Sequence, residues 1–312
     1  MKPSTLILPV LAALLLLPLI PMDARNYLLQ VLAFLFLNLV LAQSYDLMGG
    51  TMGYLNLGHI AFFGVGAYAF GILLNRGLPF LLSLPLAVLL VVLFAAIISY
   101  PFFRLRGAYF SLATFALVKL MEHVTVNLSW LTGGSNGLKI PAADRTLPIY
   151  YLGLIAVAVV ILCSWQIRRS RLGLAMKAIR EDEGVARDFG VPTFKVKAQA
   201  MMISSIFPGV MGGLYTWQLN FIIPEDIFGL KLALTPVAMA MLGGSGLLIG
   251  PVLGAVFLYA AEEVIWTNLA HLQGAVLGLV IVCVGLFMPG GLGRLPWMER
   301  LLTRMGIHEE DP

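Results

Sequence analysis

The sequence predicts an all-α polytopic membrane protein with about eight to ten transmembrane helices, including a glycine-broken or re-entrant pair near residue 243. Two observations predict this fold class. The 312 residues are 60% hydrophobic and only 12% charged, whereas soluble domains are about 45 to 50% apolar and about 25% charged. The apolar residues also form long intervals without charge, each about as long as the 20 residues that cross a bilayer. This composition excludes a soluble globule and a disordered chain.

The intervals without a charged residue mark the expected spans in chain order. They cover residues 3–22, 26–45, 47–75, 77–103, 146–167, 198–224, 232–261 and 264–293. A further span is expected at residues 107–127, which contain Lys119, Glu122 and His123. We expect helices because a helix satisfies its backbone hydrogen bonds within one segment, and the alternating pattern of a membrane barrel does not appear.

Two of these intervals need a separate interpretation. Residues 3–22 are interpreted as a retained helix rather than a signal peptide, because their apolar stretch is long and no small-residue cleavage site follows it. Residues 232–261 would form a straight helix about 45 Å long. Glycines and a proline interrupt this interval at Gly243, Gly244, Gly246, Gly250 and Pro251. We therefore expect a break near Gly243, which leaves either a re-entrant half-helix or two complete spans.

The basic residues predict the orientation of the chain. One side gathers 14 of the 20 lysines and arginines, from Lys2, the loop at Arg104 and Arg106, residues 167–197 and the tail from Arg294. The positive-inside rule makes this side cytoplasmic. We therefore expect a single transmembrane domain over residues 1–312, with a cytoplasmic loop at 167–197, a cytoplasmic tail at 294–312 and both termini in the cytoplasm.

The loop at 167–197 predicts a short amphipathic helix over residues 178–189. Its apolar residues fall within about 120° on a helical wheel, and they are Ala178, Ile179, Val185, Ala186 and Phe189. Gly190 followed by Pro192 predicts the end of this helix. Such a helix lies on anionic lipid or docks into a groove of a soluble partner. The eight basic and four acidic residues of the loop favour a partner.

Polar residues inside two expected spans have more than one interpretation. In the glycine-rich region 49–71, Asn56 and His59 are compatible with a pathway helix and with a packing helix that pairs both groups. Lys119, Glu122 and His123 share one helix face. They are compatible with proton coupling in a secondary transporter, and also with a structural role in which Lys119 reaches the outer surface.

Enzyme signatures give little support for catalysis by this chain. There is no Walker A sequence, no His-Glu-x-x-His sequence and no cysteine pattern of a metal site. Ser245 in its glycine-rich setting and His271 resemble parts of a membrane serine protease. The expected topology places Ser245 at mid-depth or toward the cytoplasm and His271 at the outer end of a span, which argues against that hypothesis.

Several runs of residues together resemble the permeases of branched-chain amino-acid ABC transporters of the LivM/LivH type, and the M-type in particular. The first run extends from Gly53-Tyr54-Leu55-Asn56-Leu57-Gly58-His59 through Ala61-Phe62-Phe63-Gly64 to Gly66-Ala67-Tyr68. The others are Gly107-Ala108-Tyr109-Phe110, Leu131 to Leu138, Arg171-Leu172-Gly173, Ala178 to Glu183, Leu242 to Gly246 and Gly250 to Ala255. The resemblance covers residues 30–290.

The resemblance implies a permease subunit in the bacterial inner membrane that forms a path for leucine, isoleucine, valine or related small polar solutes. Its expected partners are a second homologous permease, two cytoplasmic ABC ATPases and an extracytoplasmic binding protein, with no nucleic acid. The chain itself is expected to bind no cofactor and no metal, because ATP and magnesium would be used by the ATPases. Permeases for urea and short-chain amides are similar, and an ion-coupled secondary transporter is the alternative class.

The resemblance also implies two sets of site residues. The coupling segment matches the Glu-Ala-Ala loop of ABC permeases, with Gly184 where alanine is usual and Asp182 where asparagine is common. The expected coupling residues are Ala178, Ile179, Arg180, Glu183, Ala186, Arg187 and Gly190. The expected path residues are Asn56, His59, Tyr109, Gly243, Gly244 and Ser245. Pro208 stands where alanine is usual, which predicts a kink in that span.

Overall fold

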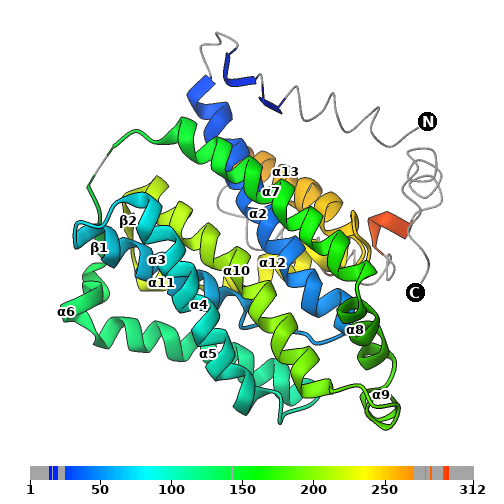
Figure 1. The fold of residues 1–312 in the computed structure, drawn as a ribbon. Coiled ribbons are helices and arrows are strands. Elements are labelled where there is room, and N and C mark those ends of the chain that lie inside the picture. Colours follow the sequence, from blue (N-terminus) through cyan, green and yellow to red (C-terminus); the bar gives the residue numbers. More distant parts are fainter. Residues whose placement is uncertain are drawn as a thin grey trace.

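The computed structural model describes residues 14–15, 17–19, 25–141, 143–269, 278, 282 and 291–294. In this part of the chain, long helices form a bundle (Figure 1). They are α2 (Arg25–Met52), α3 (His59–Asn75), α4 (Phe80–Phe102), α5 (Ala108–Asn127), α7 (Thr146–Arg169), α10 (Thr193–Leu219), α12 (Leu230–Gly243) and α13 (Gly250–Leu269). Most of the expected spans at 3–22 and 264–293 lie outside the described residues.

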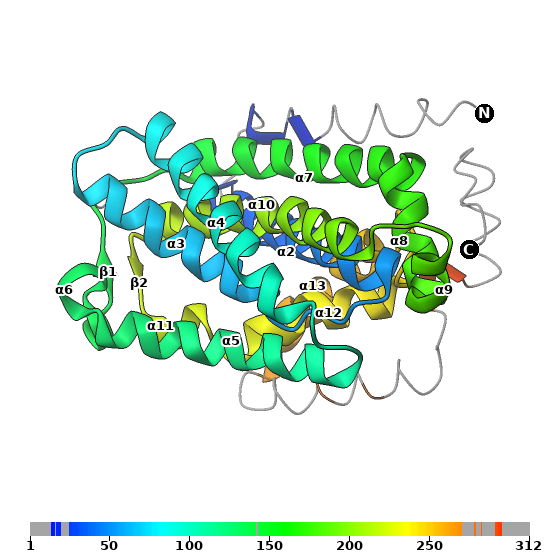
Figure 2. The ribbon, with the colours of Figure 1, turned by 60° about the horizontal axis from the view of Figure 1, so that its bottom comes forward.

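Short elements lie at the two ends of the bundle (Figure 2). One end carries α6 (Ser129–Thr132), η2 (Gly134–Asn136), β1 (Leu138–Lys139), β2 (Phe221–Ile222) and α11 (Pro224–Ile227). The strands β1 and β2 pair antiparallel, with Leu138 opposite Ile222. The other end carries α8 (Arg171–Glu181) and α9 (Glu183–Asp188). Two 3-10 turns, η1 (Leu17–Leu19) and η4 (Leu292–Arg294), complete the described elements.

Four helical segments of the described chain are long and apolar enough to cross a membrane. They are Arg25–Met52, Phe80–Phe102, Thr146–Arg169 and Pro224–Gly243, the last of which joins α11 and α12. The exposed faces of α4 and α7 are rich in large apolar side chains such as Leu81, Ile97 and Leu162. These features are those of a polytopic membrane protein, although they do not establish the expected total of eight to ten crossings.

The centre of the bundle is a close contact between α3 and α10. A Cβ atom added to Gly66 would lie 2.4 Å from the carbonyl oxygen of Gly209, and one added to Gly212 would lie 2.1 Å from that of Phe63. The two backbones therefore touch because these positions lack side chains, as in other membrane helix pairs. Within the glycine-rich region 49–71, Gly66 thus allows the close packing of α3 against α10. Pro208 lies inside α10, which continues through it from Thr193 to Leu219.

The structure corrects two boundaries expected from the charge pattern. The intervals 26–45 and 47–75 are divided by Asp46, but α2 continues through Asp46 to Met52. Asp46 remains within the helix because Arg168 neutralises it. The single helix expected at 178–189 is also wrong, because α8 ends at Glu181 and α9 begins at Glu183.

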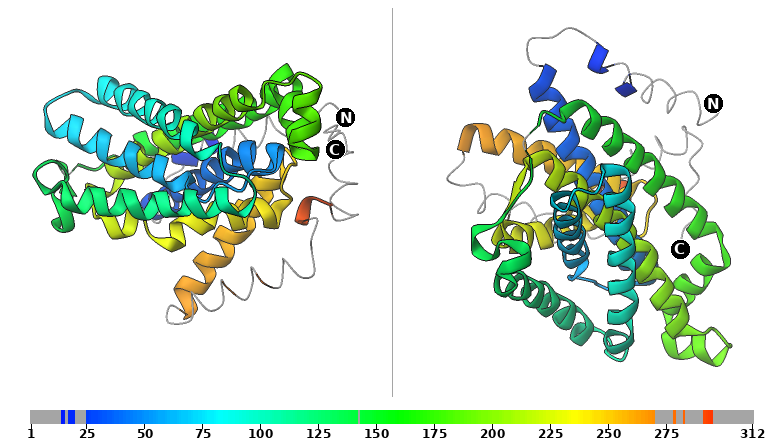
Figure 3. Two further views of the ribbon diagram at one scale, coloured as in Figure 1. Left: turned by 90° about the horizontal axis from the view of Figure 1, so that it is seen from below. Right: turned by 60° about the vertical axis from the view of Figure 1, so that its left-hand side comes forward.

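The expected break near Gly243 is present. Helix α12 ends there, and α13 begins at Gly250 after a turn of residues 244–249. The two helices pack against each other near this turn, where a Cβ atom on Gly254 would lie 1.8 Å from the carbonyl oxygen of Met239. Figure 3 shows α13 leaning away from the bundle toward its C-terminal end. The turn therefore separates two distinct helices.

Candidate functional site

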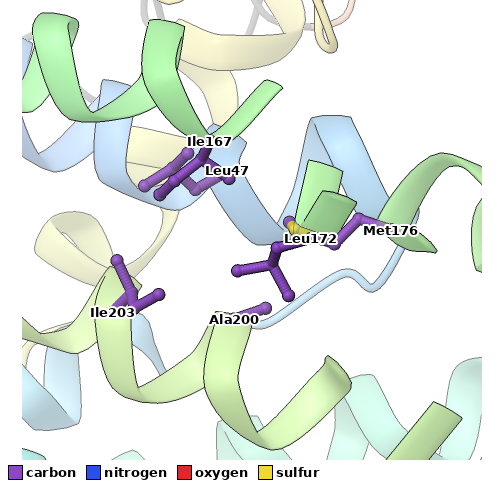
Figure 4. Close-up of a pocket in the computed structure, with 6 residues that line it drawn as sticks. All are labelled: Leu47, Ile167, Leu172, Met176, Ala200 and Ile203. Atoms are coloured by element: carbon purple, nitrogen blue, oxygen red, sulfur yellow. The ribbon is translucent and has the colours of Figure 1, made fainter. Parts of the chain in front are cut away.

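The predicted coupling segment lies at one end of the bundle, where α8 packs on three long helices. Its side chains Leu172 and Met176 meet Leu47 of α2, Ile167 of α7, and Ala200 and Ile203 of α10 around an apolar crevice (Figure 4). The crevice has no room for a water molecule. Burial of apolar surface therefore holds α8 against the membrane domain.

Asp182 divides the coupling segment into two helices. Its backbone N–H donates to the carbonyl oxygen of Ala178 at 3.2 Å, which closes α8. Its side chain accepts a hydrogen bond from the N–H of Val185 at 2.9 Å, which begins α9. An aspartate at this N-cap position stabilises a new helix start. The apolar residues predicted to line one face of a single helix are consequently divided between α8 and α9, which run in different directions.

The divided stripe has an inner and an outer part. Ile179 and Ala186 are buried against the rest of the chain, whereas Val185 and Phe189 are exposed. Phe189 is 85% exposed, which is unusual for a large aromatic side chain. The outer part of α9 therefore offers an apolar surface beside the exposed Arg187.

Glu183 anchors α9 to the bundle through an ion pair. Lys197 of α10 donates to its carboxylate at 2.7 Å, and Tyr54 donates to the other carboxylate oxygen. Lys197 also donates to the hydroxyl oxygen of Tyr54 at 3.1 Å. The Lys197 side chain is 2% exposed and that of Glu183 is 18% exposed. The pair therefore lies largely out of water, where one charge requires the other.

The ionisation of this cluster follows from its surroundings. Burial raises the pKa of Glu183, but the hydrogen bonds from Lys197 and Tyr54 and the nearby positive charges outweigh burial and hold that pKa below its ordinary value. Burial and the contact with Glu183 raise the pKa of Tyr54. Glu183 is therefore a carboxylate and Tyr54 a phenol near neutral pH, as their hydrogen bonds require.

A second ionic cluster joins α2, α7 and the turn between α12 and α13. The carboxylate of Asp46, which is fully buried, accepts from Arg168 at 2.7 Å, from the hydroxyl of Ser245 at 3.1 Å and from the N–H of Gly246 at 2.9 Å. Arg168 also donates to the carbonyl oxygens of Gly246 and Leu247. Both members of the ion pair, Asp46 and Arg168, therefore hold the turn through hydrogen bonds.

The coupling segment reaches this second cluster through Arg180. Its guanidinium donates to the carbonyl oxygen of Gly50 at 2.8 Å, one helical turn after Asp46. A Cβ atom on Gly50 would lie 2.4 Å from the nitrogen of Gly246, and one on Gly246 would lie 2.7 Å from Arg180. The backbones of α2 and the turn, and the Arg180 side chain, thus meet at one point.

Comparison with known proteins identifies the family of this chain. The family model described as the permease component of branched-chain amino acid transport systems matches residues 27–285. The chain belongs to this permease family. The match covers the coupling segment and every long helix of the described structure except the first two residues of α2.

Individual relatives of this permease are permease proteins of transport and import systems. The chain is 27% identical to the high-affinity branched-chain amino acid transport system permease protein LivM of Escherichia coli (strain K12) over 286 residues, which cover 81% of this chain and 67% of that protein. It is 26% identical to the autoinducer 2 import system permease protein LsrC of Salmonella choleraesuis (strain SC-B67) over 212 residues, which cover 65% of this chain and 60% of that protein. No solved structure matches the chain.

The coupling residues predicted for this permease come together, but they face in different directions. Ile179 and Ala186 face the bundle, and Arg180 and Glu183 bind residues of the same chain. Arg187 and Gly190 are exposed, Arg180 is exposed although its guanidinium binds Gly50, and Ala178 is half-buried. The inward group anchors the segment, and the outward group is available to another molecule.

The path residues predicted for this permease lie in three separate places. Asn56 and His59 are buried at the start of α3, where the His59 Nε2 lies 2.9 Å from the hydroxyl oxygen of Ser44. Tyr109 is exposed on α5. The remaining three path residues are Gly243, which ends α12, and Gly244 and Ser245, which begin the turn beside Asp46. The described structure therefore does not bring the six residues into one site.

Sequence reasoning missed three polar residues of the permease interior. Asp46 and Arg168 form the buried pair, and the signal for it was a single acidic residue between long apolar intervals. Gln43 is buried, and neither polar atom of its side chain has a hydrogen-bond partner in the described structure. An unpaired amide inside a membrane bundle is unfavourable, so Gln43 is an additional candidate for the solute path.

Proposed function

We propose that this chain is the membrane-spanning subunit of an ATP-driven importer in the bacterial inner membrane, and that it carries branched-chain amino acids or related small polar solutes. It would work with a second homologous permease, two cytoplasmic ABC ATPases and an extracytoplasmic binding protein. The proposed orientation places α8, α9 and both termini in the cytoplasm. The single observation that carries the proposal is the exposed Phe189 on a segment anchored in the membrane domain.

The geometry of the coupling segment supports an attachment to a separate motor. An ATPase that binds Phe189 and Val185 would apply force to α9, and the Glu183–Lys197 ion pair would transfer it to α10. Helix α8 would transfer force to α2, α7 and α10 through its apolar contacts. Alternating access would then arise from the movement of these helices relative to one another.

The relatives support the substrate class. The family model and LivM are described by branched-chain amino acid transport, whereas LsrC is described by autoinducer 2 import. We place branched-chain amino acids first because LivM matches a larger share of this chain. A test of uptake with leucine, isoleucine and valine in proteoliposomes that contain the complete transporter would examine this part of the proposal.

The alternative of an ion-coupled transporter rests on α5. There Lys119 donates to Glu122 at 2.7 Å, so the two groups neutralise each other. The lone chain in proteoliposomes should show no uptake driven by a proton gradient. Uptake by the lone chain would support the alternative and contradict our proposal.

The docking claim is tested by removing the exposed aromatic side chain. Phe189→Ser should weaken association with the ABC ATPases by about 10- to 100-fold, the loss that follows from about 1.5 to 3 kcal/mol of apolar burial. Trp130→Ser is the matched control, because Trp130 is 77% exposed at the opposite end of the bundle. The measurement is co-purification from membranes. Equal recovery of the ATPases with both variants would contradict the docking claim.

A further inference from the structure

The turn between α12 and α13 has an arrangement that packing alone does not require. Two charged side chains of other helices bind the backbone of Gly246 and Leu247. Arg168 of α7 donates to both carbonyl oxygens, and Asp46 of α2 accepts from the Gly246 N–H. Ser245 adds a fourth bond, from its hydroxyl to Asp46. A buried ion pair with several additional hydrogen bonds is costly to build and strongly fixes geometry. The position of the turn is therefore tied to α2 and α7.

The same point is in contact with the coupling segment. Arg180 of α8 binds the carbonyl oxygen of Gly50 at 2.8 Å. The Gly246 position lies against both groups, because a Cβ atom there would be 2.7 Å from the Arg180 guanidinium and 3.3 Å from the Gly50 oxygen. Arg180 thus spans from the coupling segment to the place where α2 and the turn touch.

We infer that Arg180, Asp46 and Arg168 are positioning residues that transmit movement of the coupling segment to the α12–α13 pair. The inference rests on the proposed function, since it presumes an ATPase bound to α8 and α9. Arg180 moves with α8 and carries Gly50 with it. Asp46, on the same helix as Gly50, carries the turn through Ser245 and Gly246, and Arg168 aligns Asp46 through their 2.7 Å ion pair. The turn residues Ser245 and Gly246 are therefore part of the transmission.

Arg180 and Asp46 make different contacts in this arrangement. Arg180 is the link to α8, because its bond to Gly50 is a single side-chain contact. Asp46 is the link to the turn, because it accepts both bonds from residues 245 and 246. Removal of Arg180 should therefore leave the turn in place but weaken its coupling to α8, because only the apolar contacts of α8 with α2 and α7 remain. Substitution of Asp46 should release the turn itself.

The test is hydrogen exchange in the complete transporter in nanodiscs, with and without ATP and vanadate. In the wild type, the nucleotide should change exchange of amides in α8 and also in residues 244–249. In Arg180→Gln, the change in α8 should remain, and the change in residues 244–249 should fall about tenfold, the effect of one charged hydrogen bond. Arg180→Lys should restore part of the response, because lysine keeps a charged donor.

Two further measurements complete the test. Asp46→Asn should raise exchange in residues 244–249 without nucleotide, and Arg171→Gln, at the exposed start of α8, is the control that should behave as the wild type. If α8 and the turn respond to nucleotide equally in Arg180→Gln and in the wild type, the inference is overturned. If wild-type α8 does not respond to nucleotide, the proposed function fails instead.

Discussion

The ion pair between Glu183 and Lys197 predicts an unequal response to removal of either partner. Glu183→Gln leaves the ammonium of Lys197 without a counter-charge at a position that is 2% exposed. Lys197→Met leaves the carboxylate of Glu183, which is 18% exposed and can turn toward water. The first change should therefore release α9 more readily than the second.

The magnitude follows from the burial of the two groups. Loss of a buried pair that leaves one charge behind costs about 3 to 5 kcal/mol when both groups are fully buried. Because Glu183 keeps some contact with water and Lys197 keeps its hydrogen bond to Tyr54, we expect about 2 kcal/mol for Glu183→Gln. For Lys197→Met we expect about 1 kcal/mol, and about the same for the double variant, which leaves no unpaired charge.

Hydrogen exchange of the amides in residues 184–191 measures this local opening. A cost of about 2 kcal/mol corresponds to about thirtyfold faster exchange, and about 1 kcal/mol to about fivefold. Glu181→Gln, at the exposed neighbouring acid, is the control and should leave exchange unchanged. The reasoning is refuted if the double variant exchanges as fast as Glu183→Gln, or if Lys197→Met exchanges faster than Glu183→Gln.

Three other predictions concern pH, the interior and the central helix pair. The folded pKa of Glu183 lies below its ordinary value of 4.5, so the stability that Glu183 gives to α9 is complete above pH 4.5 and is lost as the pH falls through the lower folded pKa. A spin label on Val185→Cys should become mobile in this acidic range. The added change Lys197→Met should weaken the dependence of this mobility on pH. Gln43→Leu should raise the free energy of unfolding by about 1 kcal/mol and reduce solute uptake. Unchanged uptake would remove Gln43 from the solute path. Gly212→Val should prevent accumulation of folded protein, because its Cβ would meet the Phe63 carbonyl oxygen at 2.1 Å, whereas Ala116→Val on the exposed side of α5 should accumulate normally.

The sequence predicted the helical class and most helix positions, because hydrocarbon leaves few structural options for apolar segments. The break near Gly243 was also predicted, since four glycines and a proline within nine residues rarely continue a helix. The division at Asp46 was predicted incorrectly, because a charge inside an apolar run ends a span only if no partner neutralises it. That partner, Arg168, is 122 residues away in sequence, so local patterns contain no sign of it.

The coupling segment also contains contacts that its own sequence does not predict. The wheel of residues 178–189 assumed a continuous helix and placed Asp182 inside the apolar stripe as a polar exception, whereas Asp182 acts as the N-cap of α9. The wheel therefore grouped Ile179 with Phe189, although one is buried and the other is exposed. The inward contacts of Arg180 and Glu183 depend on α2 and α10, which the loop sequence does not specify. The predicted path residues stay predictions, since the described structure contains no solute.

The glycine contact between α3 and α10 determines which parts of this permease can slide. Two helices whose main chains touch have no flexible side chains between them to absorb a displacement, so they travel as a single rigid piece. Helices α2 and α7 meet each other through longer side chains, including the Phe36–Tyr150 ring contact. Any opening of the bundle must then occur around the α3–α10 unit and not within it.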